Sequence, residues 1–255
     1  MLGEAWGTMK SLQQIRAIKS STDEAKNLSL DERIKAIAHR TEYRRMVDFE
    51  DREAVYHLRR RAYAKNNSNA EEWAAEAIDD PHEENSETIG LFIDGRLVGS
   101  VKVTVATQAY PDCQSRKYAP EAIDALLSNG GVYIDPGRLV ADPEATREFP
   151  ELPYLLIKIP ILACQYFEAH SCLSLVMIRH ASFYRRVFNS NPITEPFWCE
   201  PLQSDLVLMC GSVDDVRTSV LRRFPFWKSS YLEMRQMFGP LDEWKCIDQY
   251  RSVAA

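Results

Sequence analysis

The sequence predicts an α/β (α+β) chain built on a single mixed, twisted sheet with helices on both faces. Three observations lead to this prediction. Strand-like and helix-like stretches alternate along the 255 residues, and a turn signal at Asp94-Gly95 separates two strand-like runs. An apolar helical stretch then separates the strand-like runs 132–140 and 173–178. One sheet with helices packed on it is the simplest arrangement of these elements.

The first half of the chain begins with a helix and contains the hairpin. Ser29 and Glu32 have capping-box spacing, and the apolar stripe that follows predicts a helix. Asp94-Gly95 accepts positive φ at low cost, which predicts a tight turn between strands 88–93 and 97–107. The other elements expected here are a strand at 43–49, a helix at 50–64 and a short helix at 70–78.

The second half alternates helices and strands more regularly. We expect helices at 120–127, 152–169, 181–187 and 213–223, and strands at 132–140, 173–178 and 205–210. Pro153 suits a first helical turn, whereas Pro160 should kink the 152–169 helix or split it. The almost continuous apolar run at 173–178 is typical of a strand buried on both faces.

The domain organisation expected from these patterns has three parts. Residues 1–27 are polar and predict a flexible N-terminal arm. Residues 28–223 form the folded domain, and the aromatic-rich tail 224–255 is too apolar to be free, so we expect it to pack on the domain.

Composition excludes several classes of function. The net charge of −6 argues against a dedicated nucleic-acid binder, which needs clustered cations over a whole face. The six cysteines show no C-x-x-C pair, so neither a zinc site nor a disulfide framework is indicated. No run of about 18 apolar residues occurs, and no secretory leader is visible, so we expect a cytoplasmic protein without a transmembrane segment. A Gly-x-Ser-x-Gly hydrolase elbow is also absent.

Four motifs and the element order together resemble the GNAT-type acyltransferases. The motifs are Leu58-Arg-Arg-Arg-Ala-Tyr63, Gly95-Arg-Leu-Val-Gly-Ser-Val-Lys102, Ile134-Asp-Pro-Gly-Arg-Leu-Val-Ala-Asp-Pro143 and His180-Ala-Ser-Phe-Tyr184. Within that fold they resemble the branch of acyl-homoserine-lactone synthases and long-chain N-acyl amino acid synthases. The resemblance covers roughly residues 40–210.

The resemblance implies that strands 132–140 and 173–178 are parallel neighbours that splay apart. The pantetheine arm of an acyl donor would lie between them, where its amides pair with backbone groups that the splay leaves open. Main-chain donors near Leu139, Val140 and Ala141 would then stabilise the tetrahedral oxyanion. An apolar tunnel for the acyl chain would be lined by Leu155, Ile159, Leu162, Leu175 and Met177.

The catalytic residues implied by the resemblance are Asp135, Arg138 and Tyr184. Asp135 and Arg138 take the place of the Glu-x-x-Arg pattern of lactone synthases, and Pro136-Gly137 predicts a bulge between them. Asp135 would accept the amine proton through water, and Tyr184 would protonate the departing thiolate. The alternatives are a structural ion pair for Asp135 and Arg138 and a core aromatic for Tyr184.

The donor implied is an acyl carrier protein, with acyl-CoA as the other possible co-substrate and no bound cofactor. Acetyl-CoA users carry a glycine-containing loop that cradles pyrophosphate, and the equivalent stretch 142–153 has no glycine. A carrier protein brings a single phosphodiester and needs less of a cradle. Arg147 is a candidate phosphate contact, or else a solvated loop charge.

The acceptor expected is an amino acid or related small amine, whose carboxylate one cation can hold. Arg59, Lys102 and His180 are the candidate acceptor-binding residues, although each has an ordinary structural explanation, such as a solvated charge or a helix cap. Lys102 stands where lactone synthases usually have Arg, so their adenosylmethionine chemistry does not transfer. Asp79 and Asp80 are candidates for an ammonium group, or else an ordinary turn.

The function predicted is therefore transfer of a long-chain acyl group from acyl carrier protein to an amino acid by direct attack of the amine. Three alternatives stay open: an acetyl-CoA-dependent N-acetyltransferase, an acyl-homoserine-lactone synthase and a non-catalytic binding module of the same fold.

Overall fold

The computed structural model describes residues 28–66 and 84–247, which fall into two units that divide after His39. The smaller unit contains helix α2 (Leu30–Ala38). It begins at the predicted capping box, because the Ser29 side chain accepts from the Glu32 amide and the Glu32 carboxylate accepts from the Ser29 amide. The arm expected at 1–27 and the helix expected at 70–78 lie outside the described residues.

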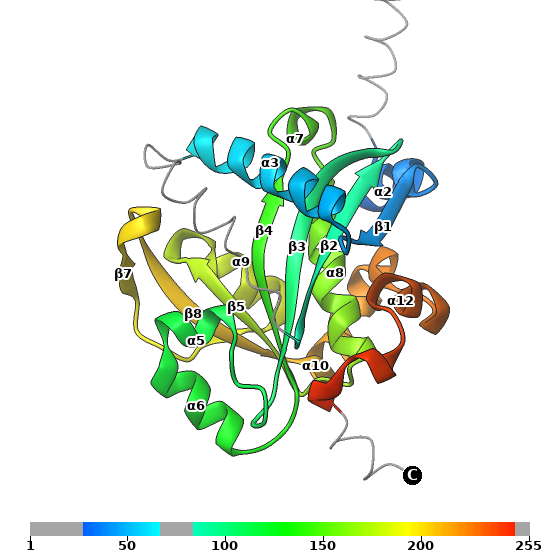
Figure 1. Cartoon of the computed structure of the whole chain (residues 1–255). Helices are drawn as coiled ribbons and strands as arrows, with labels where there is room; N and C mark the ends of the chain where they lie inside the picture. Colours follow the sequence, from blue (N-terminus) through cyan, green and yellow to red (C-terminus); the bar gives the residue numbers. More distant parts are fainter. Residues whose placement is uncertain (1–27, 67–83, 248–255) are drawn as a thin grey trace, which may run out of the picture. The chain divides into compact units, whose positions relative to one another are not determined.

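The larger unit is built on one mixed sheet, as the sequence predicts (Figure 1). The described strands are β1 (Thr41–Arg45), β2 (Ser86–Ile93), β3 (Arg96–Ala106), β4 (Tyr133–Ala141), β5 (Ser171–Met177), β6 (Asn191–Pro192), β7 (Phe197–Cys199) and β8 (Ser204–Ser212). Their order is β1-β2-β3-β4-β5-β8-β6, with β7 also paired to β8. Among the described pairings only β4–β5 is parallel.

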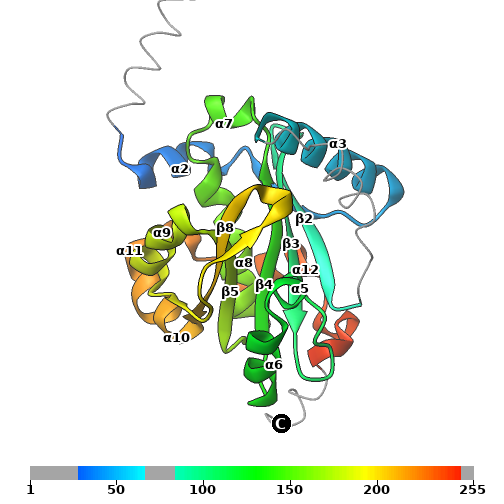
Figure 2. The ribbon, with the colours of Figure 1, turned by 90° about the vertical axis from the view of Figure 1, so that its left-hand side faces the viewer.

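Helices cover both faces of this sheet (Figures 1 and 2). They are α3 (Phe49–Asn66), α5 (Gln114–Tyr118), α6 (Pro120–Ser128), α7 (Ala145–Glu148), α8 (Leu152–Tyr166), α9 (Ile178–Phe188), α10 (Val213–Asp215), α11 (Leu221–Arg223) and α12 (Tyr231–Phe238). On one face α3 packs on Val140 and α6 packs on Tyr133. On the other face α8 approaches Gly99 through Leu156, and α9 packs on Met209.

Three local predictions can be compared directly with the structure. Asp94 and Gly95 form the turn between β2 and β3, with φ of 49° and 76°. Pro160 lies inside the single helix α8, so of the two expected outcomes, a kink or a split, the split does not occur. The helix expected at 213–223 is continuous but not uniform, because Val216–Val220 forms a π-helical segment between α10 and α11.

In the described part of the tail, several aromatic residues after Phe224 pack on the sheet-bearing unit. Trp227 is fully buried, and its indole nitrogen donates to the Tyr154 carbonyl of α8 over 2.8 Å. Tyr166 donates to the Gly239 carbonyl over 2.6 Å, and its ring stacks on Phe238. These contacts hold the described part of the tail on the face that α8 covers.

Candidate active site

β4 and β5 are hydrogen-bonded neighbours over only a short stretch. Tyr133 pairs with Ser171 and Ile134 with Cys172, and the pairing stops there although β4 continues to Ala141. The gap between the diverging strands holds a cavity of about 810 Å³, called here the central cavity. Backbone groups along its edges can pair with a bound chain that carries amides.

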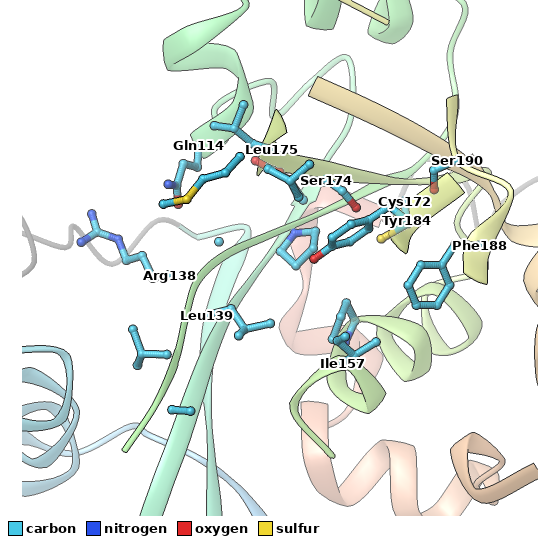
Figure 3. A pocket seen from close by; sticks show the side chains of 18 of the residues that line it. Gln114, Arg138, Leu139, Ile157, Cys172, Ser174, Leu175, Tyr184, Phe188 and Ser190 are labelled. Carbon is cyan, nitrogen blue, oxygen red and sulfur yellow. The ribbon is translucent and has the colours of Figure 1, made fainter. Parts of the chain in front are cut away.

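The central cavity passes through the sheet from one face to the other. Side chains alternate along β5, so Ser174 and Leu175 face opposite sides of the sheet, yet both line the cavity (Figure 3). On the side of α8 and α9 its wall includes Ile157, Ile161, Cys164, Tyr184, Phe188 and Val216. On the opposite side it includes Ala62, Tyr63, Gln114 and Arg138. A ligand in the gap is therefore reachable from both faces.

A bulge in β4 shapes the edge of the gap, as the sequence predicts. On β3 the step from Ser100 to Lys102 spans two residues, whereas their partners Val140 and Gly137 on β4 are three apart. The extra residue falls at Arg138, whose φ is 49°. Such a bulge shifts the side-chain alternation by one position. Asp135 and Arg138 thereby come to the same face of the sheet, the face that α5 covers.

The bulge also directs main-chain donors toward the gap. The Asp142 amide donates to the Val98 carbonyl of β3 over 2.7 Å. Because backbone groups alternate in direction along a strand, the Val140 amide also points to β3, whereas the Leu139 and Ala141 amides point to the gap. Leu139, Val140 and Ala141 all line the central cavity. Of their three amides, those of Leu139 and Ala141 face the cavity, whereas the Val140 amide faces β3.

Asp135 is buried at the edge of the central cavity and is held by helix α5. One carboxylate oxygen accepts from the Ser115 amide over 2.8 Å, and the other accepts from the Ser115 hydroxyl over 2.7 Å. Burial raises the pKa of Asp135, although these bonds and a further one from Cys113 act in the opposite direction. A raised pKa makes the carboxylate a stronger base than an exposed Asp.

Tyr184 of helix α9 also lines the central cavity, and its ring is directed into it (Figure 3). Burial, with a smaller effect of Cys172, raises the pKa of Tyr184 to about 12. The hydroxyl is therefore protonated at neutral pH and can donate a hydrogen bond to a group in the cavity.

The site also contains two cysteines that the sequence did not single out. Cys164 of α8 and Cys172 of β5 both line the central cavity. A hydrogen bond with Cys164 and burial raise the pKa of Cys172 well above its usual value, and Asp135 adds to the shift. Cys172 is therefore a neutral thiol at neutral pH and a poor nucleophile. No sequence signal marks these residues, because neither has a partner at motif spacing.

Four residues were predicted to bind the acceptor or the donor phosphate, namely Arg59, Lys102, His180 and Arg147. Of these, Lys102 lies beside the edge of the central cavity. It is buried on β3 opposite Gly137, and it lines a small recess next to the bulge. Arg59 is buried between α3 and β2, where it donates to the Thr88 hydroxyl over 3.4 Å. His180 and Arg147 are exposed on α9 and α7. These last three do not line the central cavity.

On helix α8, the wall of the central cavity differs from the predicted lining. Leu175 and Met177 of β5 line the central cavity as expected. Leu155, Ile159 and Leu162 instead lie fully in the protein core, and Ile157, Ile161 and Cys164 take their place on the cavity side. The tunnel was therefore assigned to the wrong side of α8.

No helix of the described residues is long and apolar enough to cross a membrane. Within the same residues no group of three His, Cys, Asp or Glu side chains is placed to hold a metal ion.

Comparison with known proteins gives one family and a set of similar structures. The family model of the N-acyl amino acid synthase FeeM matches residues 54–212. The solved structure of FeeM from uncultured soil microbes is similar with a TM-score of 0.58 and 15% identity, over 72% of this chain and 98% of that chain. No curated protein sequence matches.

Two further structures are similar at lower scores. An acyl-CoA N-acyltransferase from Pseudomonas aeruginosa matches with a TM-score of 0.46 and 12% identity, over 68% of this chain and 98% of that chain. The CoA-dependent acyl-homoserine lactone synthase BjaI matches with a TM-score of 0.48 and 14% identity, over 69% of this chain and 83% of that chain. The GNAT acyltransferase fold expected from the sequence is confirmed.

Proposed function

Because the chain belongs to the N-acyl amino acid synthase FeeM family and is an acyltransferase, we propose that it transfers a long-chain acyl group from a carrier-protein thioester to the amine of an amino acid. The observation that carries this proposal is the central cavity in the gap between β4 and β5. Its walls are mainly apolar on the side of α8 and α9, which suits a fatty chain. Its opposite mouth lies beside Asp135 and Arg138, which suits a polar acceptor.

The reaction follows from the groups around the gap. The amine nitrogen attacks the thioester carbonyl carbon, and the Leu139 and Ala141 amides stabilise the oxyanion that forms. Asp135 accepts the proton that the amine loses, directly or through water. The carbon–sulfur bond then breaks, and the proton returns to the thiolate, so that an amide and a free thiol result.

Tyr184 is better suited to hold the departing thiolate than to protonate it completely. Burial raises the pKa of Tyr184 to about 12. An ordinary thiol has a pKa of about 8.5, so full transfer of the phenolic proton is uphill by about 5 kcal/mol. A hydrogen bond from the hydroxyl still stabilises the developing negative charge on sulfur.

The loop after β4 favours a carrier protein over coenzyme A as the donor. Asp142 accepts from the Glu144 and Ala145 amides over 3.0 and 2.9 Å, and Arg61 donates to it over 3.1 Å. Burial opposes ionisation of Asp142, but these bonds outweigh it, and its pKa lies below the usual value. The Asp142 carboxylate therefore takes up the amides that a pyrophosphate would otherwise bind, and its negative charge repels a pyrophosphate.

Four exposed arginines on α9 and α11 provide a surface for an acidic carrier protein. Arg223 donates to the Arg186 carbonyl over 3.4 Å, which places the two helices side by side, as Figure 2 also shows. Within the described residues no carboxylate pairs with Arg185, Arg186, Arg222 or Arg223. The first residues of α9 and its end, at Arg179 and Phe188, line the central cavity. A partner docked here stands next to the wall of the gap.

The proposal is tested with purified protein, long-chain acyl carrier protein and a mixture of amino acids. We expect thiol release together with an N-acyl amino acid detected by mass spectrometry. Absence of both products would end the proposal.

The donor is tested separately by comparing acyl carrier protein with the matching acyl-CoA. Arg186→Glu and Arg222→Glu should raise KM for the carrier protein at least tenfold and leave KM for acyl-CoA unchanged, and added salt should weaken the carrier protein only. Equal use of both donors, insensitive to these changes, would contradict the carrier-protein assignment.

A further inference from the structure

The wall of the central cavity on the side of α8 and α9 contains two buried serines. Ser174 of β5 and Ser190, which follows α9, both line the cavity and are only 8% and 3% exposed. The Ser190 amide donates to the Tyr184 carbonyl over 3.4 Å, but across the described residues no group is hydrogen-bonded to the hydroxyl of either serine. Buried hydroxyls normally have a partner, so these two require an explanation.

The register of the sheet places both hydroxyls next to Cys172. Cys172 and Ser174 are two residues apart on β5, so their side chains face the same side of the sheet. Gly211 of β8 pairs directly with Cys172, and a Cβ on Gly211 would lie 2.5 Å from the Ser190 hydroxyl oxygen. Directly paired residues direct their Cβ atoms to one face, so Ser190 covers the Cys172–Gly211 pair. Figure 3 shows both serines at the end of the cavity that Cys172 and Tyr184 occupy.

These hydroxyls face the space that the proposed function gives to the acyl chain. Ile161, Phe188 and Val216 line the same side of the central cavity. The amides of the donor's arm pair with backbone groups in the plane of the sheet, whereas Ser174 points out of that plane. A saturated chain that fills the space removes water from both hydroxyls and offers them no hydrogen bond, which weakens its binding about tenfold for each.

We propose that Ser174 and Ser190 bind a hydroxyl group on the acyl chain, so that the enzyme prefers a β-hydroxyacyl donor to a saturated donor of the same length. This inference rests on the proposed function. A serine hydroxyl both donates and accepts, and a hydroxyl on the chain can do the same.

The position of the serines favours a hydroxyl close to the thioester. Ser190 is bonded to the backbone of Tyr184, whose side chain meets the departing sulfur in the proposed reaction. The substituent therefore lies near the carbonyl end of the chain. Condensation of two thioesters leaves an oxygen on the β-carbon, and reduction of that ketone gives a hydroxyl there. A donor of this kind is available wherever chains are extended on a carrier.

The test is an internal competition between tetradecanoyl and β-hydroxytetradecanoyl carrier protein, at equal concentration and with a mixture of amino acids. The ratio of the two amide products, measured by mass spectrometry at early times, equals the ratio of kcat/KM. With the wild-type protein we expect the hydroxylated product to exceed the saturated one by at least about tenfold. In the double variant Ser174→Ala/Ser190→Ala the two products should agree within about twofold, because the saturated donor no longer buries two hydroxyls and the hydroxylated donor loses its partners.

Stability provides a readout that does not depend on catalysis. Because the described residues offer neither hydroxyl a partner, the double variant should melt at the wild-type temperature or above it. A lower melting temperature would assign the serines a structural role instead. Ser182→Ala removes an exposed hydroxyl from α9 and should leave the product ratio unchanged. Repeating the competition with the two CoA thioesters keeps the outcome independent of the carrier-protein assignment.

The failure of this inference can be told from the failure of the proposed function. If the wild-type protein uses both donors equally, or if the double variant keeps the wild-type ratio, the serines do not bind a substituent of the acyl chain, although the proposed function stands. If neither donor yields an amide, the proposed function fails first.

Discussion

Asp135→Asn separates a catalytic role of this carboxylate from a structural one. The amide keeps the shape of the side chain and can still accept from Ser115, but it cannot take a proton from the amine. General bases contribute about 10²–10⁴-fold to rate, so we expect kcat/KM to fall by about that factor, or about 3–5 kcal/mol in activation free energy. The assay is thiol release from the acyl donor at saturating acceptor.

Stability should respond very differently to the same substitution. Burial raises the pKa of Asp135, so the folded state binds its proton more tightly than the unfolded state does. The stabilisation that this group contributes is complete below the unfolded pKa of about 3.9 and is lost as pH rises through the folded pKa. Near neutral pH the buried charge is a cost. Asp135→Asn removes that charge and weakens one bond to Ser115, so the free energy of unfolding should change by only about 1 kcal/mol.

The pH profile of activity provides the sharpest check. In the wild type, kcat/KM should fall as pH decreases through the raised pKa of Asp135, and this acidic limb should disappear in Asp135→Asn. Ser115→Ala is the matched control, because the Ser115 bonds lower the pKa of Asp135. Without the hydroxyl the limb should move to higher pH while the plateau stays the same. If Asp135→Asn keeps activity within threefold, with its limb intact, Asp135 is a structural anchor for α5 and the reasoning is refuted.

Three further substitutions probe other parts of the molecule. Tyr184→Phe should lower kcat about tenfold, because one charge-assisted hydrogen bond to the departing thiolate is lost. The decrease in kcat should be smaller for donors whose thiols are more acidic. An equal decrease for every donor would refute this role of Tyr184. Ile161→Phe narrows the apolar end of the central cavity. Each methylene of the acyl chain that no longer fits should cost about 0.8 kcal/mol, or about fourfold in kcat/KM. An unchanged preference for chain length would place the acyl chain elsewhere. Phe238→Ala should lower the free energy of unfolding by about 3–5 kcal/mol in a denaturant titration, because Phe238 is fully buried. A decrease below about 1 kcal/mol would mean that the tail contributes little to the stability of the fold.

Parts of the fold were predictable where a short sequence motif favours the same backbone conformation that the tertiary structure requires. Asp94-Gly95 marks its turn because only a few residue types accept positive φ at low cost, and the structure requires positive φ at both positions. Ser29 and Glu32 mark a helix start because two orphan amides need two acceptors at fixed spacing. In both cases the chemistry that fixes the backbone lies within four residues of sequence.

The helices of the site were less predictable, for two different reasons. Helix α5 has the sequence Gln-Ser-Arg-Lys-Tyr, which carries no apolar stripe, and its attachment comes from Asp135, twenty residues away. Helix α8 is apolar on all sides, so its periodicity cannot tell the side that faces the sheet from the side that faces the cavity. The assignment of Leu155 in place of Ile157 follows from that ambiguity.

Pro136 explains why β4 and β5 part where they do. The Val132 carbonyl accepts from the His170 amide over 2.8 Å, so Val132 directs its backbone groups toward β5. Direction alternates along the strand, so Ile134 and Pro136 do the same. Ile134 is the last residue of β4 that pairs with β5, and the next residue facing β5 is a proline, which has no amide to donate. Between two strands that stay side by side, a proline at this position would leave a carbonyl of the neighbouring strand without a hydrogen-bond donor. Here the neighbour has moved away, and the ladder ends where the space opens in which we propose that the thioester is attacked.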